Sequence, residues 1–139
     1  MIPSALTIAI GLFALLHIYW LFGGRFGMSA AIPEINGRPA ISPSKFVTFF
    51  VSVALSTSAL LVAALGGLLV LPLPAKLLTN LGYALALVLL FRAVGDFRLV
   101  GFFKRIHGTR FSRFDTVLFS PLCLALALGV FLVALRHRA

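Results

Sequence analysis

The residues of this chain that could transfer protons are few. Its only acidic residues are Glu34, Asp96 and Asp115, and His17 lies inside a long apolar stretch. A histidine within hydrogen-bond reach of a carboxylate can act with it as a general acid–base pair. These residue types permit an enzyme that works within a membrane on a lipid or isoprenoid, with His17 paired to one of the three carboxylates.

Basic and aromatic residues are concentrated in residues 92–115, RAVGDFRLVGFFKRIHGTRFSRFD, which hold six of the twelve Lys and Arg residues. Helical spacing would bring the apolar side chains of residues 97–107 onto one face and the basic ones onto the other. Such a segment is typical of a helix that lies in the membrane interface. One hypothesis is therefore a surface hairpin anchored by phenylalanines and lipid phosphates.

A polar pocket in the same block is the alternative hypothesis. Arg92 and Asp96 are four residues apart, so they can pair on one helix. Asp115 precedes an apolar run and is suited to be the N-cap of the helix that follows. The residues expected to bind an anionic headgroup or a partner are Arg92, Asp96, Lys104, Arg105, Thr109, Arg110, Arg113, Asp115, Trp20 and Tyr19.

The composition indicates which elements must position these residues. Hydrophobic residues make up 61% of the 139 residues and charged residues 11%, whereas a soluble domain has about 25% charged residues. A membrane-spanning helix needs about 20 mostly apolar residues. We expect such helices at residues 2–22, 46–71, 75–97 and 116–135. The predicted fold is all-α: one domain, residues 1–139, forming an integral membrane four-helix bundle with an amphipathic interfacial segment between its third and fourth helices.

The connections between these helices differ in length. Pro72 and Pro74 interrupt the chain between the second and third helices, which predicts a tight antiparallel hairpin there. Four crossings then put both long connections, with all three carboxylates, on the side opposite the termini. That side has nine basic residues, against three on the terminus side. The long loops should therefore face the cytoplasm and both termini the outside.

Several classes of chemistry lack the residues they need. Cys123 is the only cysteine, which excludes redox chemistry on an internal cysteine pair. The three histidines are scattered, with no spacing typical of a metal site, and no phosphate-loop or dinucleotide motif occurs. We therefore expect no metal and no cofactor. The net charge of +9 indicates anionic lipids rather than nucleic acid, because the basic residues flank apolar runs.

Taken together, HIYWLFGG, AIPE, NGRP and residues 92–123 resemble a family of small bacterial four-helix membrane proteins known as a domain of unknown function. The shared pattern is R-x-x-G-D-F, G-F-F-K, T-x-F, D and S-P-L, and the resemblance extends over nearly the whole chain. It implies a multi-pass protein of the bacterial inner membrane and brings no activity. It also implies that the following residues belong to one shared pattern: His17, Tyr19, Trp20, Pro33, Arg92, Gly95, Asp96, Phe97, Gly101, Phe103, Lys104, Thr109, Phe111, Asp115, Ser120 and Pro121.

Three functions remain open at this point. The first is a non-enzymatic binding or auxiliary protein with a basic pocket for an anionic headgroup or partner. The second is the enzyme described above. The third is transport of a small solute, for which a lone four-helix chain offers little room, so that it would need a dimer. The expected partners are anionic membrane lipids, with a second copy or another membrane protein as further possibilities.

Overall fold

The computed structural model describes residues 1–138, and helices dominate it. Its elements are α1 (Ile2–Leu21), α2 (Met28–Ala31), β1 (Glu34–Ile35), β2 (Arg38–Pro39), α3 (Lys45–Leu65), α4 (Ala75–Val94), α5 (Arg110–Phe114), the π-helical turn η1 (Asp115–Phe119) and α6 (Ser120–Arg138). Four helices are long and apolar enough to cross a membrane: α1, α3, α4 and the continuous helix α5–η1–α6. The predicted all-α membrane protein with four spanning helices is confirmed.

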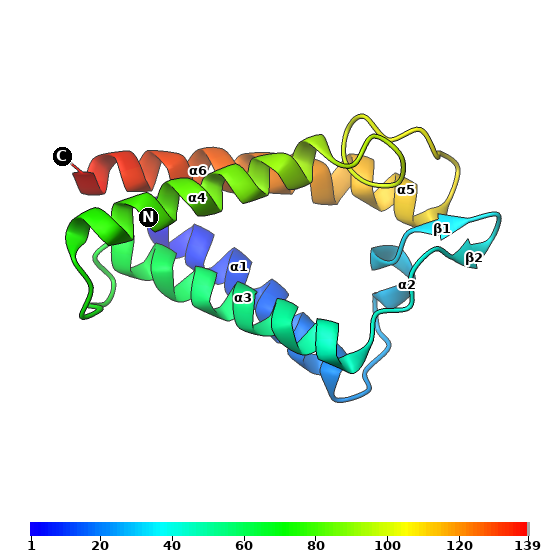
Figure 1. Ribbon diagram of the computed structural model, residues 1–139, viewed down its shortest axis with the longest axis horizontal. Coiled ribbons are helices and arrows are strands. Elements are labelled where there is room, and N and C mark those ends of the chain that lie inside the picture. Colours follow the sequence, from blue (N-terminus) through cyan, green and yellow to red (C-terminus); the bar gives the residue numbers. More distant parts are fainter. Residues whose placement is uncertain (139) are drawn as a thin grey trace.

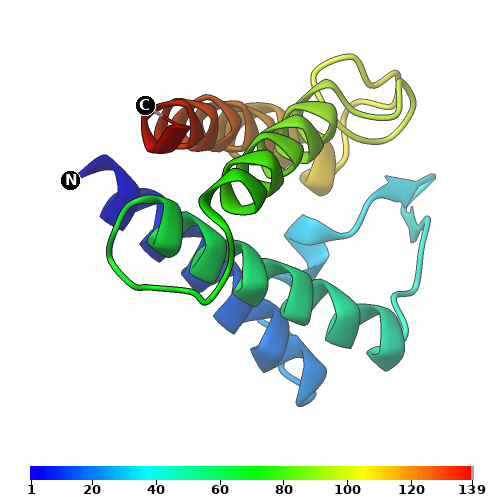
Figure 2. The ribbon, with the colours of Figure 1, turned by 60° about the vertical axis from the view of Figure 1, so that its left-hand side comes forward.

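The long helices form two pairs, α1 with α3 and α4 with α6 (Figures 1 and 2). The pairs meet near the two termini and diverge toward the opposite end of the molecule. Although α3 and α4 are consecutive, they belong to different pairs and separate from their connection onward. The predicted tight hairpin between them is therefore wrong, because α3 packs more extensively against α1, and α4 against α6, than the two pack against each other.

A small core holds the two pairs together where they meet. Glycines allow this close approach, since lipid offers no hydrophobic driving force between helices and packing must supply the attachment. A Cβ on Gly82 of α4 would lie 2.7 Å from Leu65 and 2.9 Å from Ala134, and one on Gly129 of α6 would lie 2.7 Å from Leu6. The buried side chains around these contacts include Ile10, Val62, Leu78, Ala86, Leu126, Val130 and Val133.

At the connections between the spanning helices, three helix boundaries differ from the prediction by three residues or more. The second spanning helix ends at Leu65 rather than at residue 71, because Gly67 adopts a φ of +71°. The N–H groups of Gly67 and Leu68 then bond the carbonyls of Ala64 and Ala63, which is the Schellman arrangement that ends helices.

The third helix ends at Val94 rather than at residue 97, at Gly95 with a φ of +89°. The fourth begins at Arg110 rather than at residue 116. Its N-cap is Thr109, whose hydroxyl accepts a bond from the Ser112 N–H. The prediction that Asp115 is this N-cap is wrong, and Asp115 lies one turn inside the helix.

Both long connections lie at one end of the molecule, opposite the termini and residues 66–74 (Figure 1). We call residues 22–45 and 92–115 the loop end. It contains α2, the short antiparallel pair β1–β2, and residues 95–109, and α2 packs against α5. The long connections therefore meet, as the topology of four crossings predicts.

Residues 97–107 form no helix, so the predicted helical conformation of this segment is wrong. Oδ1 of Asp96 accepts hydrogen bonds from three successive N–H groups, those of Arg98, Leu99 and Val100. A side chain that bonds nearby backbone donors competes with helix formation. Phe97 also has a φ of +61°, a conformation that an α-helix does not contain.

Candidate functional site: a buried carboxylate at the loop end

A single buried carboxylate organises the loop end. Asp115 has no exposed surface. Its Oδ1 accepts a bond of 2.9 Å from Nη2 of Arg92, and its Oδ2 accepts bonds of 2.8 Å from the Gly101 N–H and 3.0 Å from Nζ of Lys104. Both oxygens are thus occupied by donors from α4 and from the following loop. This carboxylate ties together the end of α4, the loop that follows it and the start of the fourth spanning helix.

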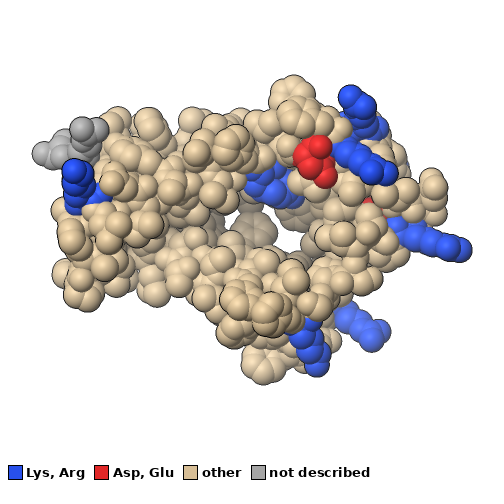
Figure 3. Space-filling view, in the orientation of Figure 1, with Lys and Arg blue, Asp and Glu red and all other residues tan. Residues whose placement is uncertain are grey.

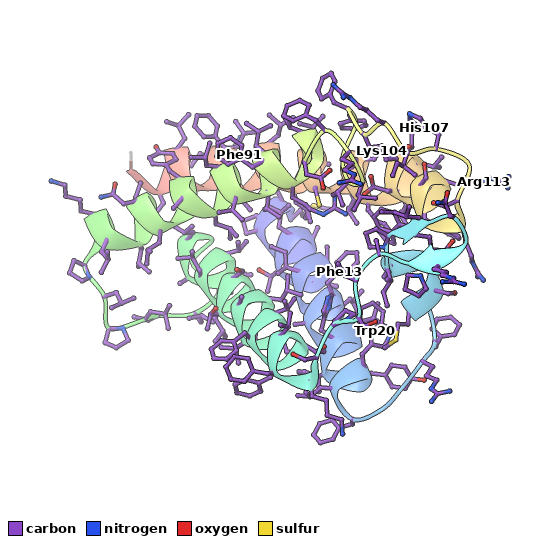
Figure 4. The ribbon with its side chains drawn as sticks, turned by 45° about the vertical axis from the view of Figure 1, so that its right-hand side comes forward. Phe13, Trp20, Phe91, Lys104, His107 and Arg113 are labelled. Carbon is purple, nitrogen blue, oxygen red and sulfur yellow. The ribbon has the colours of Figure 1, made fainter. Side chains whose placement is uncertain are left out.

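Lys104 is buried beside Asp115 rather than exposed on a basic face. Its side chain has no exposed surface. Besides Asp115, its Nζ donates to the Gly101 carbonyl at 3.0 Å and to Oγ1 of Thr116 at 2.6 Å. An ammonium has three protons to donate, and all three find acceptors here. Figure 4 shows Lys104 inside the loop end, whereas Arg113 points outward.

Arg92 pairs with Asp115, so the predicted pair between Arg92 and Asp96 is wrong. The side chain of Arg92 is 34% exposed, yet its Nη1 is buried and has no hydrogen-bond partner among the described residues. One carboxylate therefore faces two cations. The cluster of Arg92, Lys104 and Asp115 carries a net charge of about +1 at neutral pH, at the boundary between a spanning helix and the loop end.

Asp96 stabilises the loop locally instead of joining that cluster. It is exposed, and it accepts the three backbone bonds described above, at 2.7 to 3.0 Å. Slight burial raises the pKa of its carboxyl, but the backbone N–H groups of Val100, Arg98 and Leu99 outweigh that effect and lower the pKa below its ordinary value. The ionised carboxylate of Asp96 thus stabilises the backbone conformation of the loop.

Two glycines let this loop close on itself. Gly95 and Gly101 have φ values of +89° and +90°. A Cβ on Gly95 would collide with the Val100 carbonyl, and a Cβ on Gly101 would collide with the Val94 carbonyl and the Gly95 backbone. The crossing is closed by a 2.9 Å bond from the Phe102 N–H to the Ala93 carbonyl. It presents the Gly101 N–H to Asp115.

A π-helical turn begins at Asp115 and has an identifiable cause. Pro121 has no N–H to donate, and its ring would crowd the carbonyl four residues earlier in an α-helix. The widened turn, with the Ser120 N–H bonding the Asp115 carbonyl, accommodates this. Ser120 is fully buried and its hydroxyl has no partner among the described residues.

His17 and Glu34, which were also predicted as acid–base residues, make no ion pair with this cluster. Nδ1 of His17 lies 2.7 Å from the carbonyl of Phe13 in its own helix, and its ring stacks edge-on against Trp20. Trp20 donates from Nε1 to the Phe26 carbonyl, and the ring of Tyr19 packs over Gly24.

Glu34 belongs to β1 and borders a shallow hollow of about 300 Å³ together with Arg25. Within residues 1–138, neither His17 nor Glu34 makes an ion pair. The structure therefore does not bring His17 into hydrogen-bond contact with any carboxylate. No group of three or more potential metal ligands occurs in the described chain.

Of the remaining predicted binding residues, Arg105, Arg110 and Arg113 are exposed at the loop end, and Thr109 is the partly buried helix cap. Arg98, which was not among the predicted binding residues, is exposed at the same end. Figure 3 shows most of the visible basic side chains gathered at this end. Phe97, Phe102 and Phe103 are exposed among them, at 57%, 41% and 61%. The surface is thus both basic and aromatic, although it is built by an irregular loop.

Sequence reasoning missed Gly101 as a donor, Thr116 as a partner of Lys104 and the unpartnered Ser120. The glycine at position 101 and the proline after Ser120 were the available signals. The pairing of Asp115 with Arg92 had no local signal, because the two residues are 23 positions apart.

One comparison with known proteins gives a result. Residues 10–130 match the model of a family described as "Protein of unknown function (DUF3995)". No curated protein matches the chain, and no solved structure does.

Proposed function

Because the chain belongs to this family of unknown function, DUF3995, no activity can be transferred to it, and we propose a function from its own geometry. The protein is a membrane protein that binds the headgroups of anionic lipids at its loop end. Its role is binding rather than catalysis. It resides in the bacterial inner membrane with the loop end in the cytoplasm.

The observation that carries this proposal is the imbalance of charge at the loop end. Nine basic residues lie there with three acidic ones. Within the described chain, the only ion pairs are those of Arg92 and Lys104 with Asp115. Asp96 is engaged by backbone N–H groups. The exposed arginines make no ion pair among the described residues, so they are available to anions from outside the chain, and lipid phosphates are the anions present at the ends of spanning helices.

The exposed phenylalanines support a lipid surface as the source of those anions. Phe97 and Phe103 stack against each other with ring centroids 6.1 Å apart. Aromatic side chains beside basic ones suit the boundary between headgroups and acyl chains.

The experiment compares stabilisation by anionic and zwitterionic lipid. The purified protein in detergent is heated with added dioleoyl phosphatidylglycerol or dioleoyl phosphatidylcholine. We expect a higher unfolding midpoint with phosphatidylglycerol, and enrichment of anionic lipid in the purified sample by mass spectrometry. Each basic residue near a membrane surface contributes about 1 kcal/mol. Replacing Arg98, Arg105 and Arg113 by Gln should therefore weaken phosphatidylglycerol binding roughly 100-fold.

The matched control is the pair Lys76→Gln and Arg136→Gln, two exposed basic residues at the terminus end. This control should retain the response to phosphatidylglycerol. Equal stabilisation by both lipids, or an equal loss in the control, would contradict the proposal. If an anionic protein partner co-purifies in place of lipid, the basic surface serves that partner instead.

Orientation is tested separately by cysteine labelling in a Cys123→Ser background. Cysteines at Ser29 and His107 of the loop end should react with an impermeant reagent only after the inner membrane is opened, whereas one at Leu73 should react in intact spheroplasts. The reverse pattern would place the loop end outside.

A further inference from the structure

The divergence of the two helix pairs leaves an opening through the molecule. Figure 3 shows this opening as background visible between the upper layer of α4 and α6 and the lower layer of α1 and α3. It narrows toward the core around Gly82 and Gly129, and α2 packed against α5 closes its wide end. The opening lies between segments that span the membrane.

Contacts at the narrow end identify the lower wall. Leu6 of α1 packs on Gly129 of α6. Steps of three or four residues along a helix stay on one face, so the face of α1 that begins at Leu6 continues through Ile10, Phe13 and His17. Figure 4 shows Phe13 directed from α1 into the space between the pairs. Phe13 and His17 are partly buried, in contrast to the exposed Leu12 and Leu15.

The upper wall follows from the same reasoning. Gly82 of α4 receives Leu65 of α3, and the same face of α4 continues through Leu85 and Leu89. Leu122 of α6 lies about two turns from Gly129. Leu85, Leu89 and Leu122 are all partly buried and pack against the edge of the core. Phe91, on the opposite face of α4, is 63% exposed, and Val88, on the flank of the helix between the two faces, is 61% exposed.

The chemistry of these walls decides what fills the opening. A cavity needs several polar partners to hold ordered water, and the side chains identified on α1, α4 and α6 are apolar except for His17. The hydrocarbon of the bilayer is the surrounding medium at this depth. Flexible alkyl chains can enter a narrowing space, and the basic loop end lies where the headgroup of such a lipid would be.

We propose that the opening between the α1–α3 and α4–α6 pairs holds an acyl chain of the lipid whose anionic headgroup binds the loop end. The inference rests on the proposed function for the headgroup. The ligand class is then a long-chain anionic phospholipid bound by one molecule of protein, with the chain supporting the divergent helices from within.

The test separates chain from headgroup with four lipids at constant detergent concentration: dioleoyl and dihexanoyl phosphatidylglycerol, and dioleoyl and dihexanoyl phosphatidylcholine. Dioleoyl phosphatidylglycerol should raise the unfolding midpoint by about 5 °C or more when present at roughly 100 times its dissociation constant. The dihexanoyl form should give less than half of that shift. Native mass spectrometry should show one protein chain with retained lipid.

Variants on α4 locate the chain. Leu89→Trp fills the opening, so the unfolding midpoint of this variant should no longer depend on the acyl-chain length of the lipid. The midpoint should still be higher with phosphatidylglycerol than with phosphatidylcholine. Val88→Trp places the same side chain on the exposed flank of the helix and should retain both dependences. Leu89→Phe, a smaller change, serves if Leu89→Trp does not fold, and it should reduce the dependence on chain length by at least half.

The outcomes distinguish the two proposals. Equal shifts with long and short chains, or full dependence on chain length in both Leu89 variants, would overturn the acyl-chain site and leave headgroup binding intact. Equal shifts with both headgroups but a strong chain effect would overturn the headgroup proposal and retain the chain. A lipid-free dimer as the dominant species would show that a second copy fills the opening, which also overturns it.

Discussion

Replacing Asp115 by Asn is the most direct test of how the loop end is held. The carboxylate is fully buried and accepts donors on both oxygens, from Arg92, Gly101 and Lys104. An asparagine keeps the shape but offers one acceptor and one N–H₂ group, so at least one of these donors would face another donor. It also leaves the buried Lys104 ammonium without its counter-charge.

The magnitude follows from this geometry. Removing one partner of a buried ion pair costs about 3–5 kcal/mol, because the remaining charge stays desolvated. The Lys104 ammonium keeps bonds to Thr116 and to the Gly101 carbonyl, which favours the lower part of this range. We therefore expect Asp115→Asn to lower the free energy of unfolding by about 3 kcal/mol.

The assay is reversible unfolding in mixed micelles with a rising fraction of sodium dodecyl sulfate, followed by far-ultraviolet circular dichroism. Glu34→Gln is the control, since Glu34 makes no ion pair within residues 1–138, and it should change stability by less than about 0.5 kcal/mol. A double-mutant cycle with Lys104→Met should give a coupling energy of about 1–3 kcal/mol.

Two results would refute the reasoning. One is a loss below about 1 kcal/mol for Asp115→Asn, which would mean that the carboxylate is solvated or not engaged. The other is additivity of Asp115→Asn and Lys104→Met, which would mean that the two groups do not interact.

Three further predictions concern the loop and the cap. Gly95→Ala should cost more than about 3 kcal/mol, because the methyl group meets the Val100 carbonyl at a φ of +89°. Gly108→Ala, at a φ of +87° with open space around it, should cost only about 1–2 kcal/mol; equal losses in the same unfolding assay would rule out the backbone crossing. Thr109→Ala should cost about 1 kcal/mol through loss of the cap bond to the Ser112 N–H, and Thr109→Ser should restore most of it. Because the pKa of Asp96 is lowered by folding, its ionised carboxylate stabilises the loop fully at pH values above the unfolded pKa of about 3.9, and this stabilisation is lost as the pH falls through the lower folded pKa. Limited digestion by pepsin should therefore cut near Phe97 and Phe102 only at the lowest pH values of the series. Asp96→Asn, which lacks the carboxylate, should be cut there at higher pH as well.

Much of the fold could be predicted from the sequence alone. The four apolar stretches determine four spanning helices, because a continuous apolar segment of about 20 residues satisfies its own backbone in hydrocarbon as a helix. An even number of crossings puts both long connections at one end of the molecule, so the basic residues of these connections must lie at that end too. The helix boundaries were less accurate, since Gly67 and Thr109 act through backbone geometry that hydrophobicity does not record.

Only the tertiary structure decided the pairings of charge. Arg92 has Asp96 one turn away, but it bonds Asp115 from another helix, and Lys104 turns inward to the same carboxylate. Spacing along a helix gives the partners a residue could reach, whereas the free energy of burying a charge depends on every donor that the fold brings to it. The grouping of α1 with α3 and α4 with α6, and the opening between them, were likewise decided by packing of surfaces that are uniformly apolar in sequence.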